Sequence, residues 1–401
     1  MLRKLSVKNF RLLRDVTIDV EPGKPIVLIG PNGSGKSSVI QVLDLLSRWG
    51  DEGFQQGCSA FGKFLTAGQK QTTIEIETDV LAHWLERPDG MQLLYRVEVA
   101  TIHDVNATEY LAKRSDSASS FNPVLNRSGS KLTFTNETTL SEEVFDIPEN
   151  LLSFERVKQA KVFPSLSELN RAIQNIVVYD GFLTTPSWTR DLREAKLSPF
   201  NSVTIETIER IGRRGLDLTN ALYYIQQNFG EIWDDLMDHF RAEFPFVQRL
   251  EFPADRVGGS ISLAFRDKRY PGERLQSHQM SEGMATYLCL LAAILSPSPA
   301  TAIAFDEPDR HLHPSALRRI AFLLERASEK TAVFVATHSD RFLDYLSDPG
   351  GSIRICEPTS EGVKLRMLNG EALDEWRKLY SMSTLRERGQ LDPSNNEDYE
   401  P

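Results

Sequence analysis

The sequence of 401 residues has little cysteine and no excess of positive charge. Its three cysteines, Cys58, Cys289 and Cys356, are too few and too scattered for a disulfide framework or a zinc site. The net charge of −10 argues against a protein that coats nucleic acid through general basicity, although a local basic patch could still contact it. Low cysteine use fits a reducing compartment, so we expect a cytoplasmic protein.

Long apolar runs are also missing. The longest, Ala285 to Leu295, is too short to span a bilayer and is followed by Ser296-Pro297. The opening stretch alternates charged and apolar residues, so we expect neither a secretory signal nor a membrane partner. The chain has no internal repeat and no long heptad array, which excludes a coiled-coil arm.

The stretch from Ile26 to Ile40 is the most informative part of the sequence, and the other motifs are interpreted in relation to it. An apolar run predicts a strand, and a helical pattern begins at Lys36. The loop residues and the residues that open the helix are Gly30, Pro31, Asn32, Gly33, Ser34, Gly35, Lys36, Ser37 and Ser38. This G-x-x-x-x-G-K-S pattern between a strand and a helix is typical of the P-loop (the Walker A motif), whose backbone N–H groups hold phosphates.

The pattern therefore predicts a nucleoside triphosphate site. Lys36 would reach the β- and γ-phosphates, and the Ser37 hydroxyl would bind Mg²⁺. A GTPase is disfavoured because no Asn-Lys-x-Asp motif for reading the base is present. The expected ligands are ATP and Mg²⁺.

Two acidic residues follow a second apolar run, Ile303 to Phe305. In the Walker B arrangement, Asp306 would hold Mg²⁺ through water, and Glu307 would polarise the attacking water as general base. An Asp-Glu pair by itself is more often a solvated strand end. The P-loop in the same chain favours the catalytic interpretation.

Two other motifs each allow two interpretations. His338 ends the apolar run Val333 to Thr337, where it could reach the γ-phosphate or be merely structural. Ser281 precedes an apolar helix and could simply cap it. Together with Gly283 it could instead form an anion site aimed at a γ-phosphate.

The order of these motifs resembles that of ABC-type ATPases, in particular the SMC/RecF/OLD-like branch (AAA family ATPases of the AAA_21 kind). Ser281 and Gly283 stand at the family's signature position, and the stretch from Asp306 to Pro314 is similar to the "DEPExxLHP" of this branch. Residues 336–339 match its "ATHS". Transporter subunits carry Gln-Arg after the signature, whereas Ala285-Thr286 follows here, so a transporter subunit is disfavoured.

The resemblance implies an ATPase whose two protomers pack head to tail on ATP. Ser281 and Gly283 of one protomer would then contact the triphosphate held by the other protomer's P-loop. His311 and His313 would lie at the dimer seam, or they would only lead into the helix that begins at Pro314. The Q-loop glutamine of the family has no counterpart that we can assign, because Asp180 follows the expected strand.

Relatives of this kind act in DNA repair or in antiviral defence against phage and plasmids, often beside a separately encoded nuclease or toxin. The resemblance thus implies a homodimer or a higher oligomer and an effector partner, and it leaves DNA open as a further partner. Too few residues follow His338 for a Toprim nuclease domain, so we expect no nuclease activity on this chain. The alternative is a nucleotide-dependent scaffold that binds DNA or inhibits an effector with negligible turnover.

The expected fold is α/β: a P-loop core sheet of mixed or parallel strands, an antiparallel β lobe and a helical lobe. We assign the nucleotide-binding and β lobe to 1–150, the helical lobe to 151–270, the signature and Walker B part to 271–350, and a tail to 351–401. Residues 115–130 are expected to be a loop and 203–211 a helix. A small basic excess over 154–218 predicts either phosphate contact or a solvated helical face.

Overall fold

The structure is a computed structural model that describes residues 1–62, 64–80, 90–100, 106–115, 118–137, 139–156, 163–184, 202–254, 259–360, 362–367 and 384. All structural statements below concern these residues. None of the helices among them is both long and apolar enough to cross a membrane.

The core is a six-stranded sheet that gathers segments from the whole chain. Its strands, in spatial order, are β10 (Ile176–Tyr179), β16 (Ala302–Asp306), β17 (Ala332–Ala336), β3 (Ile26–Ile29), β18 (Ile353–Thr359) and β19 (Gly362–Met367). The first five run parallel and β19 is antiparallel. The central strands are buried along almost their whole length, because helices cover both faces. The carboxyl ends of β3, β16 and β17 therefore meet at one edge.

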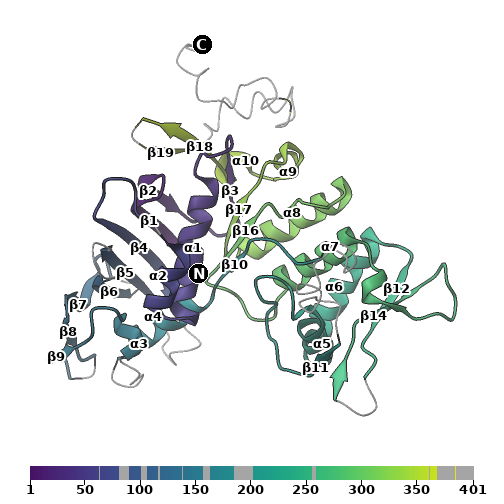
Figure 1. The fold of residues 1–401 in the computed structure, drawn as a ribbon, viewed down its shortest axis with the longest axis horizontal. Helices are drawn as coiled ribbons and strands as arrows, with labels where there is room; N and C mark the ends of the chain where they lie inside the picture. The colour runs from purple at the N-terminus through teal and green to yellow at the C-terminus, as the bar shows by residue number, and fades with distance from the viewer. Residues whose placement is uncertain are drawn as a thin grey trace.

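Alternate side chains of the core strands point to opposite faces, which separates two hydrophobic cores. Ile26 and Leu28 pack with α1 (Lys36–Asp51), α2 (Phe54–Phe61) and α4 (Pro164–Gln174). Val27 and Ile29 pack on the other face. The helices of that face are α5 (Leu218–Asn228), α6 (Gly230–Glu243), α7 (Glu282–Ile294) and α8 (Pro314–Ser328). α1 and α7 thus lie on opposite sides of the sheet (Figure 1).

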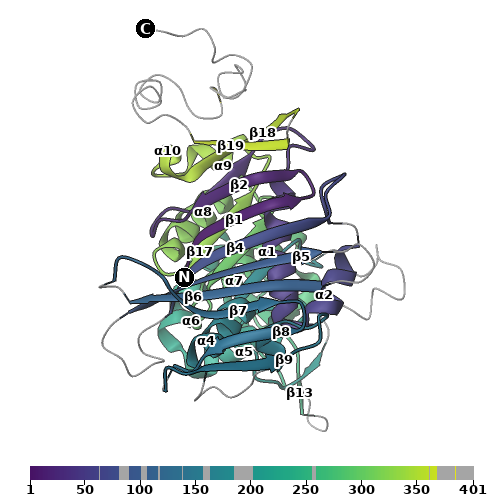
Figure 2. The same ribbon diagram turned by 90° about the vertical axis from the view of Figure 1, so that its left-hand side faces the viewer.

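An eight-stranded antiparallel sheet packs on the α1 side (Figure 2). In spatial order it contains β2 (Leu13–Asp19), β1 (Leu2–Phe10), β4 (Gln71–Val80), β5 (Met91–Ala100), β6 (Asn106–Ser115), β7 (Asn122–Ser128), β8 (Lys131–Thr135) and β9 (Glu142–Asp146). A short helix, α3 (Ser153–Arg156), follows it. The fold is therefore the predicted α/β architecture with an antiparallel β lobe.

The helical lobe also carries small sheets. One joins β12 (Val247–Glu251), β14 (Ala264–Asp267) and β15 (Leu275–Gln276), and another pairs β11 (Val203–Thr204) with β13 (Ser260–Ile261). A 3₁₀ turn (Ser277–Gln279) leads from β15 to α7. Two short helices, α9 (Asp340–Asp344) and α10 (Pro349–Ser352), lie between β17 and β18.

Two local expectations are wrong. Residues 115–130 are not a loop throughout, because β7 occupies Asn122–Ser128 and extends the sheet. Residues 203–211 form no helix, since Val203 and Thr204 pair with β13 and no regular element follows before α5. β18 and β19 extend the core sheet within the segment expected to be a tail. Two parts of the basic stretch 154–218, residues 157–162 and 185–201, lie outside the described residues.

Candidate functional site: a P-loop with Walker B residues

The P-loop forms a tight turn between β3 and α1. Gly30, Gly33 and Gly35 all have positive φ (146°, 76° and 93°), the region that side chains disfavour. A Cβ atom on Gly30 would lie 2.6 Å from the Cys356 carbonyl oxygen, and one on Gly35 would lie 2.8 Å from Val363 Cγ2. The loop therefore depends on glycine both for its backbone conformation and for its fit against β18 and β19.

The side chains of the loop suit a triphosphate. Lys36 Nζ donates hydrogen bonds to the carbonyl oxygens of Gly30 (2.8 Å) and Pro31 (3.0 Å), which holds the ammonium group within the loop. The Ser34 hydroxyl is buried and has no hydrogen-bond partner among the described residues. A buried hydroxyl without a partner is costly, and a phosphate oxygen in the loop would satisfy it. The residues present thus fit the expected nucleotide.

Asp306 stands at the carboxyl end of β16, where the Ser37 side chain is close enough to affect its ionisation. Burial raises the pKa of Asp306, and the nearby Glu307 charge acts in the same direction, while the Ser37 side chain acts to lower it. A partly desolvated carboxylate beside a hydroxyl is an oxygen donor pair of the type that Mg²⁺ takes. The two residues expected to hold Mg²⁺ therefore lie together.

Glu307 follows in a left-handed conformation (φ 52°), with its N–H donating to the Ala336 carbonyl oxygen at 2.7 Å. This backbone bond places Glu307 beside the end of β17. Its Oε1 lies 3.7 Å from His338 Nε2, and its Oε2 accepts a hydrogen bond from Arg310 Nε at 2.5 Å. The predicted base and the predicted γ-phosphate sensor are thus neighbours.

A second link holds the same two loops together. The Thr337 hydroxyl donates to Asp309 Oδ1 at 2.6 Å and accepts from the Ser339 N–H at 2.9 Å. Thr337 is fully buried, so this link is shielded from water. It fixes the loop after β16 against the loop that carries His338.

The signature residues, Ser281 and Gly283, lie apart from the P-loop and the Walker B residues. Ser281 is exposed and caps α7 by accepting a hydrogen bond from the Met284 N–H at 3.2 Å. A Cβ on Gly283 would lie 2.8 Å from the His311 carbonyl oxygen, which places this corner against the loop after β16. Because α7 and α1 cover opposite faces of the core sheet, the signature corner is not part of the group formed by Lys36, Ser37 and Asp306.

The two histidines of the loop after β16 differ. His313 caps α8, since its Nδ1 accepts from the Ser315 N–H at 3.4 Å and lies 2.8 Å from the Ser315 hydroxyl oxygen. His311 is exposed, with φ 65°, and its Nδ1 lies 3.6 Å from Glu282 Oε2. Capping of α8 thus accounts for His313, while His311 connects the loop after β16 to Glu282 at the signature corner.

Sequence reasoning missed two features of the site. The first is Arg310, which pairs with Glu307. The only sequence signal for this pair is that Arg310 follows Glu307 by three residues. Arg213 forms an ion pair with Asp44 and so ties the segment before α5 to α1, and no motif marks it. The Q-loop stays unassigned, because the exposed Asp180 directly follows β10.

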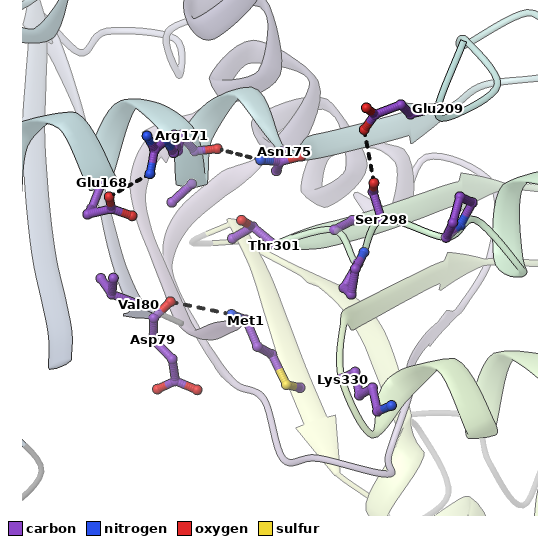
Figure 3. A pocket seen from close by; sticks show the side chains of 14 residues that line it. Met1, Asp79, Val80, Glu168, Arg171, Asn175, Glu209, Ser298, Thr301 and Lys330 are labelled. Atoms are coloured by element: carbon purple, nitrogen blue, oxygen red, sulfur yellow. Dashed lines mark hydrogen bonds and ion pairs between the residues drawn. The ribbon is translucent and has the colours of Figure 1, made fainter. Parts of the chain in front are cut away.

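A cavity of about 420 Å³ lies at the opposite edge of the core sheet (Figure 3). Asn175, Thr301 and Lys330 line it and precede β10, β16 and β17, so the cavity is at the amino ends of these strands. Its walls carry internal pairs, including Glu168 with Arg171 at 2.8 Å. Ligands of open α/β sheets bind at the carboxyl ends of the strands, so this cavity is separate from the P-loop site.

Comparison with known families agrees with this geometry. The family model described as "AAA domain, putative AbiEii toxin, Type IV TA system" matches residues 51–344, and a model described as "AAA ATPase domain" matches residues 1–84. The first match covers well over half of the sequence, so this chain belongs to that family of AAA domains. The chain is thus a P-loop ATPase related to ABC-type and SMC proteins, as the motif order predicted.

Similar curated proteins match only in part. The chromosome partition protein Smc of Pyrococcus furiosus is 24% identical over 169 residues, which cover 36% of this chain and 14% of that protein. The hemin import ATP-binding protein HmuV of Agrobacterium fabrum is 61% identical over 33 residues (8% and 13%). The zinc import ATP-binding protein ZnuC of Yersinia pestis is 43% identical over 44 residues (10% and 17%). The chain thus spans less than a fifth of the length of these relatives.

Solved structures are similar over nearly the whole chain. The SmcHead bound to the C-winged helix domain of ScpA gives a TM-score of 0.57 at 16% identity, covering 93% of this chain and 99% of that one. A Smc head domain with an extended coiled coil, derived from Pyrococcus furiosus, gives 0.53 at 14% identity, covering 94% and 98%. At such low identity the similarity concerns the fold, which is that of an SMC head.

Proposed function

We propose that this chain is an ATP-hydrolysing switch. The observation that carries the proposal is the meeting of Glu307 with His338 at 3.7 Å, next to Asp306, which lies near Ser37. Lys36 and the loop amides would hold the β- and γ-phosphates, with Ser37 and Asp306 holding Mg²⁺. Glu307 would take a proton from the attacking water, and His338 would contact the γ-phosphate. Bound Mg²⁺ would supply charge neutralisation at the phosphates.

We further propose that two copies pack head to tail when ATP is bound. Ser281 is exposed, and its helix lies across the core sheet from α1. The hydroxyl of Ser281, the amide of Gly283 and the N-terminus of α7 form an anion-binding corner that a second copy can present to a neighbouring P-loop. Binding and hydrolysis would then switch the pair between a closed and an open state.

The partner that reads this switch is, in our proposal, a separately encoded effector such as a nuclease or toxin. The family description refers to a toxin and to a type IV TA system, which supports a role in defence more than one in DNA repair. We place this role in the cytoplasm.

The competing proposal is a nucleotide-dependent scaffold with negligible turnover. One observation favours it: Glu307 Oε2 already accepts a hydrogen bond from Arg310 at 2.5 Å, so that oxygen is engaged in an ion pair. Under this alternative, ATP binding alone would change the affinity for DNA or for an effector.

Glu307→Gln separates the two proposals. As a switch, the variant should bind ATP, lose turnover by at least about a hundredfold, and accumulate as a dimer in size-exclusion chromatography with Mg-ATP. Lys36→Ala is the matched control, because it should lose ATP affinity and stay monomeric. A wild-type chain without turnover, with or without DNA, and a Glu307→Gln variant of unchanged oligomeric state would support the scaffold.

A further inference from the structure

Three arginines on the helical lobe share one carboxylate. Glu251 Oε1 accepts hydrogen bonds from Arg249 Nε and Arg266 Nε, both at 2.9 Å, and Glu251 Oε2 accepts one from Arg274 Nε at 2.7 Å. One negative charge thus faces three positive charges, which leaves the cluster with an excess of two. Each arginine bonds to Glu251 through Nε, and Arg266 Nη1 also donates to the Gly272 carbonyl oxygen at 2.9 Å, so Arg249 and Arg274 carry the more exposed guanidinium groups of the cluster.

The cluster occupies one face of the sheet β12–β14–β15. Strand register pairs Arg249 with Arg266, and Arg274 directly precedes β15, the next strand. The alternate positions Leu250 and Phe265 are buried in the hydrophobic core on the other face. The arginines therefore form a row across three strands on the outer face, spaced by about 4.8 Å per strand.

Repulsion within this row of arginines lowers the stability of the folded chain when no anion is bound. Like charges directly opposite on neighbouring strands destabilise a sheet, and a single glutamate neutralises only one of the three. The side chains of Arg249 and Arg274 are 59% and 45% exposed, whereas Arg266 is 23% exposed. An external anion would offset the repulsion among them, which gives the row a reason to be present.

The turn from β14 to β15 lies beside the arginines and is neutral overall, because Lys268 and Arg269 are balanced by Asp267 and Glu273. Lys268 Nζ donates to the Pro245 carbonyl oxygen at 2.7 Å, and the Arg269 guanidinium lies 3.8 Å from the Phe246 ring centroid. Asp267 also holds Arg269, through a 2.6 Å ion pair. These contacts keep the turn in place beside the row, to which it adds no net charge. In Figure 1 the strands β12 and β14 lie at the margin of the molecule, opposite the β7–β9 margin.

We propose that this arginine face, defined by Arg249, Arg266 and Arg274, binds the phosphate backbone of double-stranded DNA. Arginine forks suit phosphate oxygens, and a duplex offers one negative charge per about 1.7 Å of its axis. Single-stranded nucleic acid is less suited, because it is usually held by a series of aromatic rings that stack on successive bases, whereas the turn beside the three arginines offers one exposed ring, Tyr270. Arginines directed at phosphates gain nothing from the 2′-hydroxyl of RNA.

The test is fluorescence anisotropy with the full chain and a labelled DNA duplex, without nucleotide, over a range of salt concentrations. Arg249→Gln/Arg274→Gln should weaken binding by about tenfold or more at low salt. It should also lower the slope of log affinity against log salt by about 2, since each lost phosphate contact removes about 0.9. The affinity of the variant for two unrelated duplex sequences should fall by the same factor.

The matched control, Arg318→Gln/Lys131→Gln, removes two exposed positive charges from other surfaces and should keep both affinity and slope. The melting temperature of the arginine-face variant should stay the same or rise, because repulsion is relieved while Arg266 still pairs with Glu251. A lower melting temperature would show that the arginines are structural and overturn the proposal. So would unchanged DNA binding, or preference for single-stranded DNA, duplex RNA or an acidic peptide. ATP is absent, so the result is independent of the proposed switch.

Discussion

Glu109 in the antiparallel lobe and Glu307 at the P-loop edge each pair with an arginine, but in opposite surroundings. Glu109 and Arg127 are fully buried and lie 2.7 Å apart. Glu109 also accepts hydrogen bonds from the Tyr95 hydroxyl (2.8 Å) and the Ser153 hydroxyl (2.7 Å). Arg127 additionally donates to the Gly129 and Pro148 carbonyl oxygens at 2.9 and 3.0 Å. The buried pair is thus held by several hydrogen bonds on both sides.

Glu307 has looser surroundings. Its side chain is 27% exposed, Arg310 is 69% exposed, and the His338 ring lies 3.7 Å from the carboxylate. The left-handed backbone of Glu307 adds strain, which costs of order 1–3 kcal/mol at such positions. The same ion-pair chemistry therefore fixes one lobe rigidly, while at the site it leaves a carboxylate that a ligand can reorganise.

Arg127→Met offers the strongest test of this difference. It would leave the Glu109 carboxylate buried without its cation, so we expect the free energy of unfolding to fall by about 3–5 kcal/mol. Urea denaturation measures this change. Arg310→Met is the matched control at the exposed pair and should cost less than about 0.5 kcal/mol. Equal losses for both variants would remove the distinction between the two pairs.

Asp306→Asn should stabilise the protein, and the change in the free energy of unfolding should be smaller than that of Arg127→Met. Because Asp306 is a partly buried carboxylate next to Glu307, its neutral replacement should raise the free energy of unfolding by about 1 kcal/mol at neutral pH. Turnover of Mg-ATP should be lost in the same variant, because the carboxylate expected to hold Mg²⁺ is gone. A destabilised Asp306→Asn protein would contradict the assignment of Asp306 as a functional carboxylate whose burial lowers stability.

The pH dependence of that effect has a defined sign. The pKa of Asp306 in the folded chain is raised above its ordinary 3.8, so the folded state binds more protons than the unfolded state just above pH 3.8. The Asp306 contribution to stability therefore falls as pH rises through this window. The stability gain of Asp306→Asn should accordingly be present at neutral pH and vanish below pH 3.8, as urea denaturation at several pH values would show.

The functional edge was predictable from sequence because its residues belong to short motifs at strand ends. Lys36, Asp306 and His338 each follow an apolar run, and parallel strands bring such positions to one edge. The pairing of Glu307 with Arg310 was not predictable, since it depends on the left-handed turn after β16. The motif order indicated a shared nucleotide site, but no local signal shows which face of the sheet carries Ser281.

The antiparallel lobe was harder to predict for a related reason. β7 contains Arg127 at a position where an apolar residue would mark a strand, and its partner Glu109 is 18 residues away. Buried ion pairs therefore hide the alternation that identifies strands. Val203 to Ile211 shows the converse error: apolar spacing suggested a helix, whereas the Asn220 side chain donates to the Thr204 carbonyl oxygen at 2.9 Å and holds the segment extended.

Arg310→Gln should give the smallest change in stability and the sharpest test of the site. Removing an exposed partner should alter the free energy of unfolding by less than about 0.5 kcal/mol. It frees Glu307 Oε2, which now accepts from Arg310 at 2.5 Å, so we expect single-turnover ATP hydrolysis to rise by roughly two- to fivefold. Arg318→Gln, an exposed arginine of α8, is the control for charge and should leave turnover unchanged.

The direction of the Arg310→Gln effect decides what the Glu307–Arg310 pair does. If Arg310 restrains the carboxylate, turnover rises while ATP affinity stays the same, because Lys36 and the loop amides are untouched. If turnover instead falls toward the level of Glu307→Gln, then Arg310 positions the base. The exposed Glu307–Arg310 pair would in that case hold its carboxylate in a fixed position, as the buried Glu109–Arg127 pair does. The contrast between the two regions would then have to be abandoned.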